Sequence, residues 1–420
     1  MVIAKEHSPR AAQGKRSGRI VLQGKTGKEF KLIKPKVKVH SLTGRITPDL
    51  MRKAFQNVKR NRGAAGIDKE SIKMFEANRE QNLDALMRRL KQRTFVPKPA
   101  RRTYIPKSKD KFRPLGIPCV RDRIAQEVLR LLLSPIFEPL FHNDSYGFRP
   151  ERNCHQAVER VLELWHRGYR HVLDADVQGF FDNIPHSVIM EGLSAVIADG
   201  NILGLVEKFL RAGVMENGVF KPTTVGTPQG GVISPLLANI ALNFQDWHLA
   251  QHGIRFVRYA DDFVVLCRTQ RRAKEALILV ERFLNDQLGL NLSPEKTHVT
   301  TFKEGFSFPG FDICSRSVKM RGKSVEKFKS KIRELTRRSW NLDAEVIDDV
   351  NQVVRGTANY FAMPWTHNRC TFRTLDKWIR MRLRCMKFNR KWKTDNQRFR
   401  LKHFRRRGLL SMIDFYEAPA

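Results

Sequence analysis

Two adjacent acids stand inside an apolar stretch of this chain. Asp261 and Asp262 follow Tyr259-Ala260 and precede Phe263-Val-Val-Leu266. Neighbouring carboxylates repel each other unless a cation lies between them, and hard cations such as Mg²⁺ prefer oxygen ligands. An isolated Asp-Asp pair is more often a solvated turn than a metal site. The rest of the chain has to decide between these two interpretations.

A third acid lies far upstream. Asp176 comes near the end of a predicted strand over residues 169–177, in which alternation puts Val172, Asp174 and Asp176 on one face. If this strand and the strand of Asp261 are neighbours in one sheet, three carboxylates converge. Two Mg²⁺ ions about 3.5–4 Å apart on such a cluster activate a 3′-hydroxyl and stabilise a leaving pyrophosphate. The chemistry indicated is nucleotidyl transfer, which needs mainly positioning and charge neutralisation.

The elements that position these acids follow from the pattern of apolar residues. Apolar and β-branched residues on both sides of the two acids, within residues 258–266, predict a β-hairpin with Asp261 and Asp262 at its bend. The strand that ends near Asp176 is expected to turn over 179–182, before a helix that opens at Pro185-His186. Further predicted elements are helices over 122–133, 158–165 and 272–288 and a short strand over 290–292.

Two other stretches suit contacts with phosphate. Short strands over 103–107 and 112–118 predict a basic hairpin, and Lys107 and Arg113 on it could close over a triphosphate. An exposed charged turn is an equal interpretation of that hairpin. Residues 226–231, Gly-Thr-Pro-Gln-Gly-Gly, form a loop ahead of a predicted helix, whose backbone N–H groups could contact phosphate or a base. Alone, this loop is weak evidence.

The chain is strongly basic, with 78 Lys and Arg against 42 Asp and Glu and a formal net charge of +36. Such a surface repels itself unless it meets a polyanion, and nucleic acid fits better than an acidic membrane surface. Residues 1–44 hold eleven Lys or Arg against two Glu and are expected to form a flexible basic arm. A solvated tail and a transit peptide are the alternatives for that arm. Residues 371–410 hold fifteen Lys or Arg against two Asp, interleaved with aromatics that suit a nucleic-acid surface.

Length and composition narrow the class further. A chain of 420 residues with a 41% hydrophobic fraction is expected to form two or three packed units. No apolar run reaches the roughly 18 residues of a spanning helix, so no membrane partner is expected. The six cysteines are scattered and include no Cys-x-x-Cys pair, which fits a reducing compartment. His367 and Cys370 have a ligand-like spacing but no second pair nearby, and no zinc site is expected there.

Seven motifs identify a family resemblance that covers roughly residues 45–390. The chain resembles the reverse transcriptases encoded by bacterial group II introns, and the motifs occur in the order of that family. They are Gly63-Ala-Ala-Gly-Ile-Asp68, Arg113-Pro-Leu-Gly-Ile-Pro118, Ser145-Tyr-Gly-Phe-Arg-Pro150, Asp176-Val-Gln-Gly-Phe-Phe-Asp182, Thr227-Pro-Gln-Gly-Gly-Val-Ile-Ser-Pro-Leu-Leu-Ala-Asn-Ile240, Tyr259-Ala-Asp-Asp262 and Arg355-Gly-Thr-Ala-Asn-Tyr-Phe361.

The resemblance implies an α+β fold, a right-hand polymerase in which fingers and an antiparallel palm precede an α-helical thumb. The expected domains are the basic arm over 1–44, an N-terminal extension and fingers over 45–168, the palm over 169–318, the thumb (domain X of maturases) over 319–393, and a short basic segment over 394–420.

The resemblance also implies roles for single residues. The expected metal ligands are Asp176, Asp261 and Asp262, with Val177 beside them, and the three acids are the expected catalytic residues. Phe181 is expected to be the sugar gate, a ring that clashes with a 2′-hydroxyl and so favours dNTP over rNTP; Phe180 is the alternative if the register differs by one. The other expected nucleotide contacts are Lys107, Arg113, Gln229 and Lys296.

The implied function is RNA-directed DNA polymerisation that copies RNA into cDNA, with two Mg²⁺ ions and Mn²⁺ as a substitute. Expected partners are an RNA template, a DNA or RNA primer, dNTPs and group II intron RNA, which the protein would bind as a maturase in splicing and retrohoming. One alternative is a related reverse transcriptase without an intron, acting in DNA repair or phage defence. Another is a non-catalytic RNA-binding splicing factor, against which the clustered acids argue. The expected location is the bacterial cytoplasm, with an organelle as the alternative.

The sequence departs from the family pattern at both ends. Residues 394–420 leave little space for the DNA-binding domain that usually follows the thumb, and no His/Cys-rich endonuclease module comes after it. Site-specific target cleavage is therefore not expected. The basic arm before residue 45 is longer than expected for the family.

Overall fold

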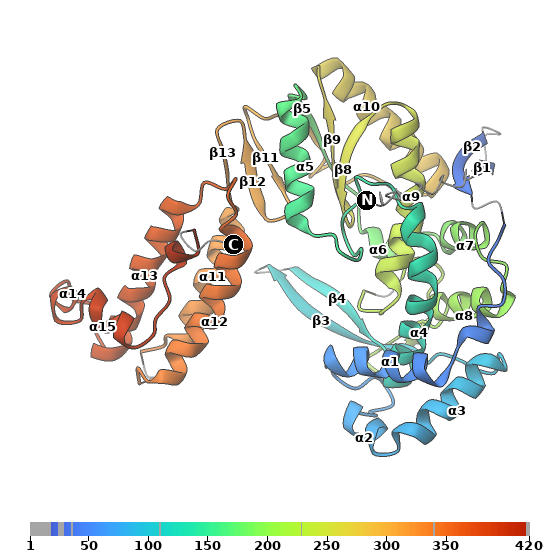
Figure 1. Cartoon of the computed structure of the whole chain (residues 1–420), viewed down its shortest axis with the longest axis horizontal. Helices are drawn as coiled ribbons and strands as arrows, with labels where there is room; N and C mark the ends of the chain where they lie inside the picture. Colours follow the sequence, from blue (N-terminus) through green and yellow to red (C-terminus); the bar gives the residue numbers. More distant parts are fainter. Residues whose placement is uncertain are drawn as a thin grey trace, which may run out of the picture. The chain divides into compact units, whose positions relative to one another are not determined.

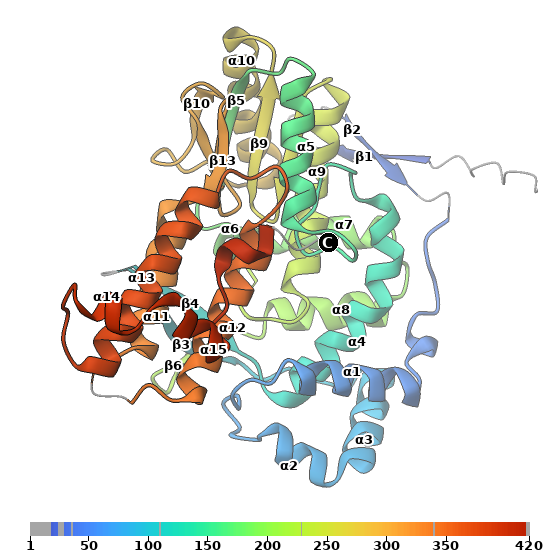
Figure 2. The ribbon, with the colours of Figure 1, turned by 60° about the vertical axis from the view of Figure 1, so that its left-hand side comes forward.

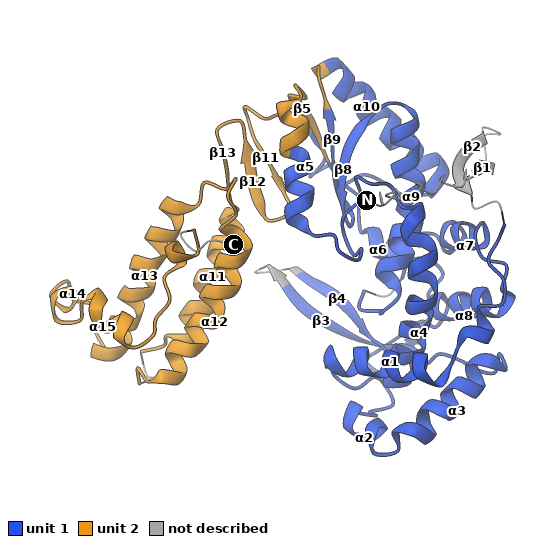
Figure 3. Cartoon of the chain, in the orientation of Figure 1, with its two compact units in different colours: residues 1–161, 175–266, 271–298 blue, residues 162–174, 267–270, 299–420 orange. Residues whose placement is uncertain are grey.

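The computed structural model describes residues 18–23, 29–34, 37–108, 111–227, 229–338 and 341–416. The chain divides into two compact units, residues 1–161, 175–266 and 271–298, and residues 162–174, 267–270 and 299–420 (Figure 3). Much of the predicted basic arm lies outside the described residues. Within it, β1 (Gly18–Gln23) and β2 (Glu29–Lys34) pair in antiparallel fashion. The domain boundaries expected above stay a prediction.

The first unit opens with helices that pack on one long helix. Helix α1 begins after Thr47, whose side chain accepts a hydrogen bond from the Leu50 N–H at 3.2 Å, with Pro48 at the first helical position. Its apolar face is buried through Ala54, Phe55 and Val58. The elements of this layer are α1 (Pro48–Arg60), α2 (Ile72–Ala77), α3 (Arg79–Lys91) and α4 (Val120–Phe137), seen together in Figure 1.

A four-stranded sheet carries the predicted basic hairpin. Strands β3 (Ala100–Ser108) and β4 (Lys111–Ile117) pair in antiparallel fashion, with Ile105 opposite Arg113. The sheet order is β4-β3-β6-β7, where β6 is Val214–Glu216 and β7 is Val219–Lys221. The sequence predicted this hairpin correctly; β3 is longer than the predicted 103–107, and β4 is shifted by one residue from the predicted 112–118.

A second four-stranded sheet carries the predicted acids. Its order is β10-β5-β9-β8, so the strands of Asp176 and Asp262 are hydrogen-bonded neighbours. The strands are β5 (His171–Asp176), β8 (Arg255–Tyr259), β9 (Asp262–Cys267) and β10 (His298–Thr301). Helix α9 (Ser234–Gln251) is buried on nearly all sides, as expected of a helix that is apolar all round.

Five further helices of the described residues surround this sheet in the sequence. They are α5 (Cys154–His166), α6 (Phe180–Asn183), α7 (His186–Ser194), α8 (Gly200–Leu210) and α10 (Gln270–Phe283), the last continued by a π-helical turn over Leu284–Leu288. The predicted strand over 290–292 is wrong: Leu292 makes only an isolated antiparallel bridge to Val177. Two flanking leucines are too short a run to sustain a ladder.

The second unit is mainly helical, as predicted beyond residue 319. A three-stranded antiparallel sheet, β11 (Phe306–Phe308), β12 (Phe311–Cys314) and β13 (Ser317–Met320), precedes three long helices that lie side by side (Figure 2). These are α11 (Gly322–Leu335), α12 (Ala344–Phe361) and α13 (Arg369–Phe388), followed by α14 (Asp395–Arg398) and α15 (Leu401–Arg406).

The C-terminal segment returns onto these helices. The Met412 N–H donates to Asp376 Oδ1 at 2.9 Å, and the Leu410 N–H donates to Asn351 Oδ1 at 2.9 Å. Met412 and Phe404 are fully buried. Residues 401–416 are therefore part of the packed second unit. Among the described residues, no helix combines the length and apolar content needed to cross a membrane.

Candidate active site

The two adjacent acids lie at a tight turn between β8 and β9. Tyr259 pairs with Asp262, which leaves Ala260 and Asp261 as a two-residue loop. Ala260 has φ +60°, a left-handed conformation that tight hairpin loops need and that costs about 1 kcal/mol or more for a residue with a Cβ. Asp262 begins β9 and is exposed, whereas Asp261 is half-buried. The two acids therefore have different surroundings.

The buried side chain of Arg258 fixes this turn by hydrogen bonds. Its guanidinium is fully buried and donates to both carboxylate oxygens of Asp246, at 2.6–3.1 Å. Its Nη1 also donates to Asn239 Oδ1 at 2.9 Å and to the Ala260 carbonyl at 2.8 Å. A buried arginine is tolerated only when its donors are satisfied in this way. The strained loop residue is thus fixed by a hydrogen-bonded network inside the protein.

Sequence reasoning assigned no role to Arg258, Asp246 or Asn239. A signal was present, because Arg258 is the only charge inside the apolar run Phe256 to Tyr259. Buried charges in such a run need a partner of opposite sign. Nothing in the sequence singles out Asp246, twelve residues earlier on α9, from the other acids.

The turn that contains Gly147 and Phe148 packs directly against the acidic hairpin. The Tyr146 N–H donates to the Arg258 carbonyl at 2.9 Å, and Asn239 Nδ2 donates to the Gly147 carbonyl at 2.9 Å. A Cβ built on Gly147 would lie 2.1 Å from the Ala260 backbone nitrogen. Only glycine fits at this close approach. The motif around Gly147 therefore supports the acidic turn.

Asp176 lies at the end of β5, beside the strand that starts with Asp262. Lys296 Nζ donates to Asp176 Oδ2 at 2.7 Å, so two residues predicted for the site form an ion pair. The Asp176 backbone is held by the Ser293 N–H, which donates to its carbonyl at 2.8 Å. Val177, the next residue, is buried and bridges to Leu292. The segment that carries Lys296 is thus laid along the end of β5.

Electrostatics link Asp261 to its predicted neighbours. Burial raises the pKa of the Asp261 carboxyl, and the charge of Asp176 raises this pKa further. A hydrogen bond from its own backbone N–H and the charges of Arg113 and Lys296 lower the pKa. Burial is the largest of these influences, because it penalises the charged carboxylate. The structure therefore brings Asp176, Asp261, Arg113 and Lys296 within electrostatic reach of one another.

The donor set suits a hard divalent cation only in part. Among the described residues, no group of three or more His, Cys, Asp or Glu side chains is arranged to hold a metal ion. The predicted convergence of three carboxylates is therefore not preformed. Mg²⁺ is commonly held by one or two carboxylates together with waters and substrate phosphates. Asp176 and Asp261 fit that pattern, provided that Lys296 leaves Asp176.

The two candidate gate residues differ sharply in burial. The Phe180 ring is 2% exposed and belongs to the core, whereas Phe181 is half-buried. Their ring centroids lie 5.4 Å apart, with the planes inclined at 66°. Only the second ring of the pair has a face that a nucleotide can reach.

The glycine-rich loop, residues 226–231, joins β4 to helix α6, which carries Phe180 and Phe181. The Thr227 N–H donates to the Phe181 carbonyl at 2.7 Å, and the Gly116 N–H donates to the Gln229 carbonyl at 2.7 Å. A Cβ on Gly230 would lie 2.5 Å from the Gly116 carbonyl oxygen, so glycine is required there. Gln229 Nε2 lies 3.4 Å from Asp182 Oδ2, a long hydrogen bond. The loop thus connects β4 to helix α6.

On the basic hairpin, the structure describes the side chain of Arg113 but not that of Lys107. Arg113 is exposed on β4. Burial raises the pKa of the Asp182 carboxyl, and the charges of Arg102 and Arg113 lower this pKa by a smaller amount. Lys107 belongs to β3, but its side chain lies outside the described part of the structure. Its predicted contact with a triphosphate stays a prediction.

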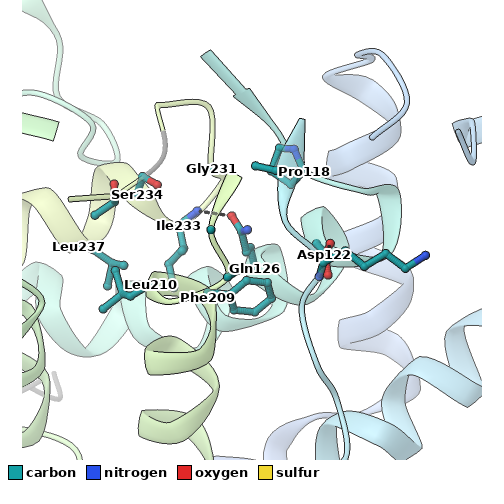
Figure 4. A pocket seen from close by; sticks show the side chains of 14 residues that line it. Pro118, Asp122, Gln126, Phe209, Leu210, Gly231, Ile233, Ser234 and Leu237 are labelled. Carbon is teal, nitrogen blue, oxygen red and sulfur yellow. Dashed lines mark hydrogen bonds between the residues drawn. The ribbon is translucent and has the colours of Figure 1, made fainter. Parts of the chain in front are cut away.

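A small cavity lies beside the glycine-rich loop, between it and α4 (Figure 4). Its empty volume, including space open to solvent, is about 430 Å³. Gln126 Oε1 accepts hydrogen bonds from the Val232 N–H at 2.7 Å and the Ile233 N–H at 3.4 Å, and Thr227 Oγ1 is buried without a partner. A polar orphan of this kind suits an ordered water. None of the predicted site residues lines the cavity, and we assign it no ligand.

Comparison with protein families defines the class of this fold and site. The family described as "Reverse transcriptase (RNA-dependent DNA polymerase)" matches residues 105–313, which include β4, the sheet of β5, β8, β9 and β10, and the residues predicted for the site. The family described as "Group II intron, maturase-specific domain" matches residues 325–408, the helices that follow. The chain carries a reverse transcriptase domain followed by a maturase domain.

Two curated proteins cover most of this chain. Group II intron-encoded protein LtrA of Lactococcus lactis subsp. cremoris is 30% identical over 431 residues, 78% of this chain and 71% of LtrA. Protein YkfC of Escherichia coli is 33% identical over 323 residues, 67% of this chain and 85% of YkfC. The chain belongs to the family of group II intron-encoded reverse transcriptases and maturases.

These matches confirm the predicted family and the predicted α+β polymerase fold. A solved telomerase from Candida albicans, in complex with a fragment of telomeric RNA, overlaps 73% of this chain and 60% of the telomerase chain. The sequence identity is 14% and the TM-score 0.43, too low to carry weight here. The partner class that the two domains define is nucleic acid, as the net charge of +36 predicts.

Proposed function

We propose that this protein is an active RNA-directed DNA polymerase, which copies RNA into cDNA by two-metal nucleotidyl transfer. The observation that carries the proposal is the placement of Asp176 at the end of β5 and of Asp261 in the turn that leads into the neighbouring strand β9, with Arg113 and Lys296 within electrostatic reach. A protein that only bound RNA would gain nothing from carboxylates gathered near phosphates. Clustered acids with cations at their edge suit the transfer of a phosphoryl group instead.

The acids would hold the cation, and Lys296 would change partner. A divalent cation on Asp176 and Asp261, Mg²⁺ with Mn²⁺ as a substitute, supplies charge stabilisation for the attacking 3′-oxygen and the leaving pyrophosphate. Lys296 Nζ neutralises Asp176 Oδ2 at 2.7 Å in the protein alone. Freed from Asp176, the ammonium is available to a phosphate of the incoming nucleotide. Asp262 and the carbonyl of Val177 are the other proposed ligands.

The remaining contacts of the nucleotide follow the predicted roles. Arg113, exposed on β4, would bind the triphosphate together with Lys107. Gln229 lies on a loop that is hydrogen-bonded to both β4 and Phe181 of helix α6. This position supports a contact between Gln229 and the base of the nucleotide. The half-buried Phe181 is a better candidate for the sugar gate than Phe180, because a ring in the core cannot meet a 2′-hydroxyl.

We also infer that the second unit binds group II intron RNA, as a maturase does. Helix α13 buries Phe372, Leu375 and Ile379 on one side and keeps Arg373 and Lys377 exposed on another. Such a face attracts a phosphate backbone by charge, without sequence preference. The role without an intron, in DNA repair or phage defence, keeps the same residues and is separated from this one by whether the protein retains its own intron RNA.

Primer extension tests the polymerase proposal. With an RNA template, an annealed DNA primer, dNTPs and Mg²⁺, the wild-type protein is expected to extend the primer. Asp261→Ala should lower the rate by at least about 10³-fold, because a bound metal supplies several kcal/mol of transition-state stabilisation. Asp286→Ala removes an exposed carboxylate from the same unit and should keep the wild-type rate. Equal extension by the Asp261→Ala protein and the wild type would exclude the assignment of Asp261.

A further inference from the structure

The ring of Phe148 is exposed although it lies next to the predicted sugar gate. It is 57% exposed, and its centroid lies 6.4 Å from that of Phe181, with the ring planes inclined at 76°. This is an edge-to-face arrangement, which favours a defined geometry between two rings. A large apolar ring left open to solvent beside a proposed substrate contact calls for a functional explanation.

The backbone of Phe148 is held in an energetically unfavourable conformation. Phe148 has φ +59°, the left-handed region that bulky residues rarely adopt. Both neighbours are fixed: the Gly147 carbonyl accepts from Asn239 Nδ2, and the buried Arg149 donates to the carbonyls of His142 and Ser145 at 2.7 Å. Strain that the surroundings maintain in this way is typical of functional sites.

The turn that aims Phe148 is fastened to the hairpin that carries Asp261. Gly147 lies against the Ala260 backbone with no space for a Cβ, and the Tyr146 N–H donates to the Arg258 carbonyl. The position of the Phe148 ring is therefore fixed relative to the acidic turn. A ring that only covered the surface would not need a fixed position relative to the acidic turn.

Phe181 consequently has an aromatic neighbour on two sides. The buried Phe180 contacts it from the core at 5.4 Å, and Phe148 meets it from the solvent side at 6.4 Å. A ring can reject a 2′-hydroxyl only if it cannot swing away, and contact on one side leaves that motion open. The second contact is the one that Phe148 supplies.

We propose that Phe148 is a positioning residue for sugar selection, which braces the Phe181 ring against the 2′-hydroxyl of an incoming ribonucleotide. The inference rests on the proposed polymerase function and on Phe181 as the gate. Phe148 itself does not touch the reacting atoms. Its loss should leave the chemistry in place and weaken only the discrimination between deoxyribose and ribose.

Steady-state kinetics with single nucleotides test this role. For Phe148→Ala, the ratio of kcat/KM for dATP over ATP should fall about tenfold, the effect of one lost edge-to-face ring contact. The fall should come from better use of ATP, with kcat for dATP nearly unchanged. Phe148→Tyr keeps the ring and should retain the wild-type ratio. Phe220→Ala, which removes another exposed ring (51%) of the same unit, is the matched control and should also retain it.

A double variant separates bracing from a direct contact. If Phe148 acts through the gate, Phe148→Ala combined with Phe181→Ala should discriminate no worse than Phe181→Ala alone. Additive losses would overturn the proposal, since they would indicate an independent contact with template or primer. A wild-type ratio in Phe148→Ala would overturn it as well.

Nucleotide binding without turnover distinguishes a failure of this inference from a failure of the polymerase proposal. A primer that ends in a 3′-deoxynucleotide, annealed to RNA, allows dATP and ATP to be titrated with no extension. If the wild type does not extend primers but Phe148→Ala still narrows the difference in Kd between dATP and ATP, the polymerase proposal fails and the bracing role stands. If the wild type extends primers and Phe148→Ala changes neither ratio, only the bracing role fails.

Discussion

The acidic hairpin of the first unit and helix α13 of the second use arginine in opposite ways. Arg258 is fully buried, with five hydrogen bonds to Asp246, Asn239 and the Ala260 carbonyl. Arg373 and Lys377 on α13 are exposed, above a buried apolar row on the same helix. The same charge fixes a backbone in one region and is offered to a polyanion in the other.

Desolvation explains why the two uses do not mix. A buried guanidinium loses its hydration and is stable only when every partner is in place, so its geometry is specific and its removal costly. An exposed cation keeps its water and gains only by releasing counterions from a nucleic acid, so single positions matter little and their effects depend on salt. Substitutions in the two regions should therefore have effects of different magnitude, on stability in one region and on the salt dependence of binding in the other.

The largest effect is expected at the buried arginine. Arg258→Met should lower the free energy of unfolding by about 3–5 kcal/mol, because it leaves Asp246 buried without a partner, and it should abolish primer extension through loss of the Ala260 contact. Urea denaturation measures the first and primer extension the second. Arg255→Met, at an exposed position of the same strand, is the control and should change stability by no more than about 0.5 kcal/mol.

A double variant sharpens this prediction. Arg258→Met combined with Asp246→Leu removes both charges and should recover much of the stability, since an apolar pair of similar volume can replace a buried ion pair. Extension should stay absent, because neither residue then fixes the Ala260 carbonyl. Recovery of full activity together with stability would show that the network does not position the acidic turn.

An intermediate effect is expected at Asp122, one of the two buried acids of α4. Burial raises the pKa of Asp122 to about 7, although the Lys98 N–H donates to its carboxyl at 3.3 Å. The unfolded carboxyl titrates at about 4, so the native state binds the proton more tightly. Stability should therefore be lost as pH rises from about 4 to about 7, by a few kcal/mol at most. Asp122→Asn should remove this slope in denaturation curves measured across that range, and a slope unchanged in the variant would contradict the raised pKa.

The smallest effect is expected on α13. Arg373→Gln combined with Lys377→Gln should lower the slope of log affinity against log salt by roughly 1.5 for binding to RNA, at about 0.7–0.9 per lost phosphate contact. The free energy of unfolding should not change, because both side chains are exposed. Filter binding at several salt concentrations measures the slope. Lys274→Gln combined with Arg282→Gln, exposed on α10, is the matched control, and an equal change there would remove the case for α13 as the RNA surface.

Much of the fold and part of the site could be predicted from the sequence. The apolar and β-branched residues on both sides of Asp261 and Asp262 predicted the hairpin correctly, and the strand of Asp176 is the hydrogen-bonded neighbour that the nucleotidyl-transfer hypothesis requires. The strand over 290–292 was predicted wrongly, because two leucines in a short run have the same pattern in a bridge as in a strand. The convergence of three carboxylates is not preformed among the described residues.

The contacts that complete the site could not be predicted. Phe180 and Phe181 are adjacent and identical in type, so only the packing shows which ring is buried. The ion pair of Lys296 with Asp176 and the approach of Phe148 to Phe181 join residues far apart in the chain. Local pattern carries no information on such distances.

The sequence by itself determined the family of this protein and the class of its partner. The ordered motifs identify the reverse transcriptase family, and the net charge of +36 indicates a nucleic-acid partner, because side-chain type sets which ligands a surface accepts. The tertiary structure alone decided how the acidic turn is held, through Arg258, Asp246, Asn239 and Gly147. Its physical reason is burial: a charge or a strained backbone is stable only where surrounding residues, distant in sequence, replace the water that it has lost.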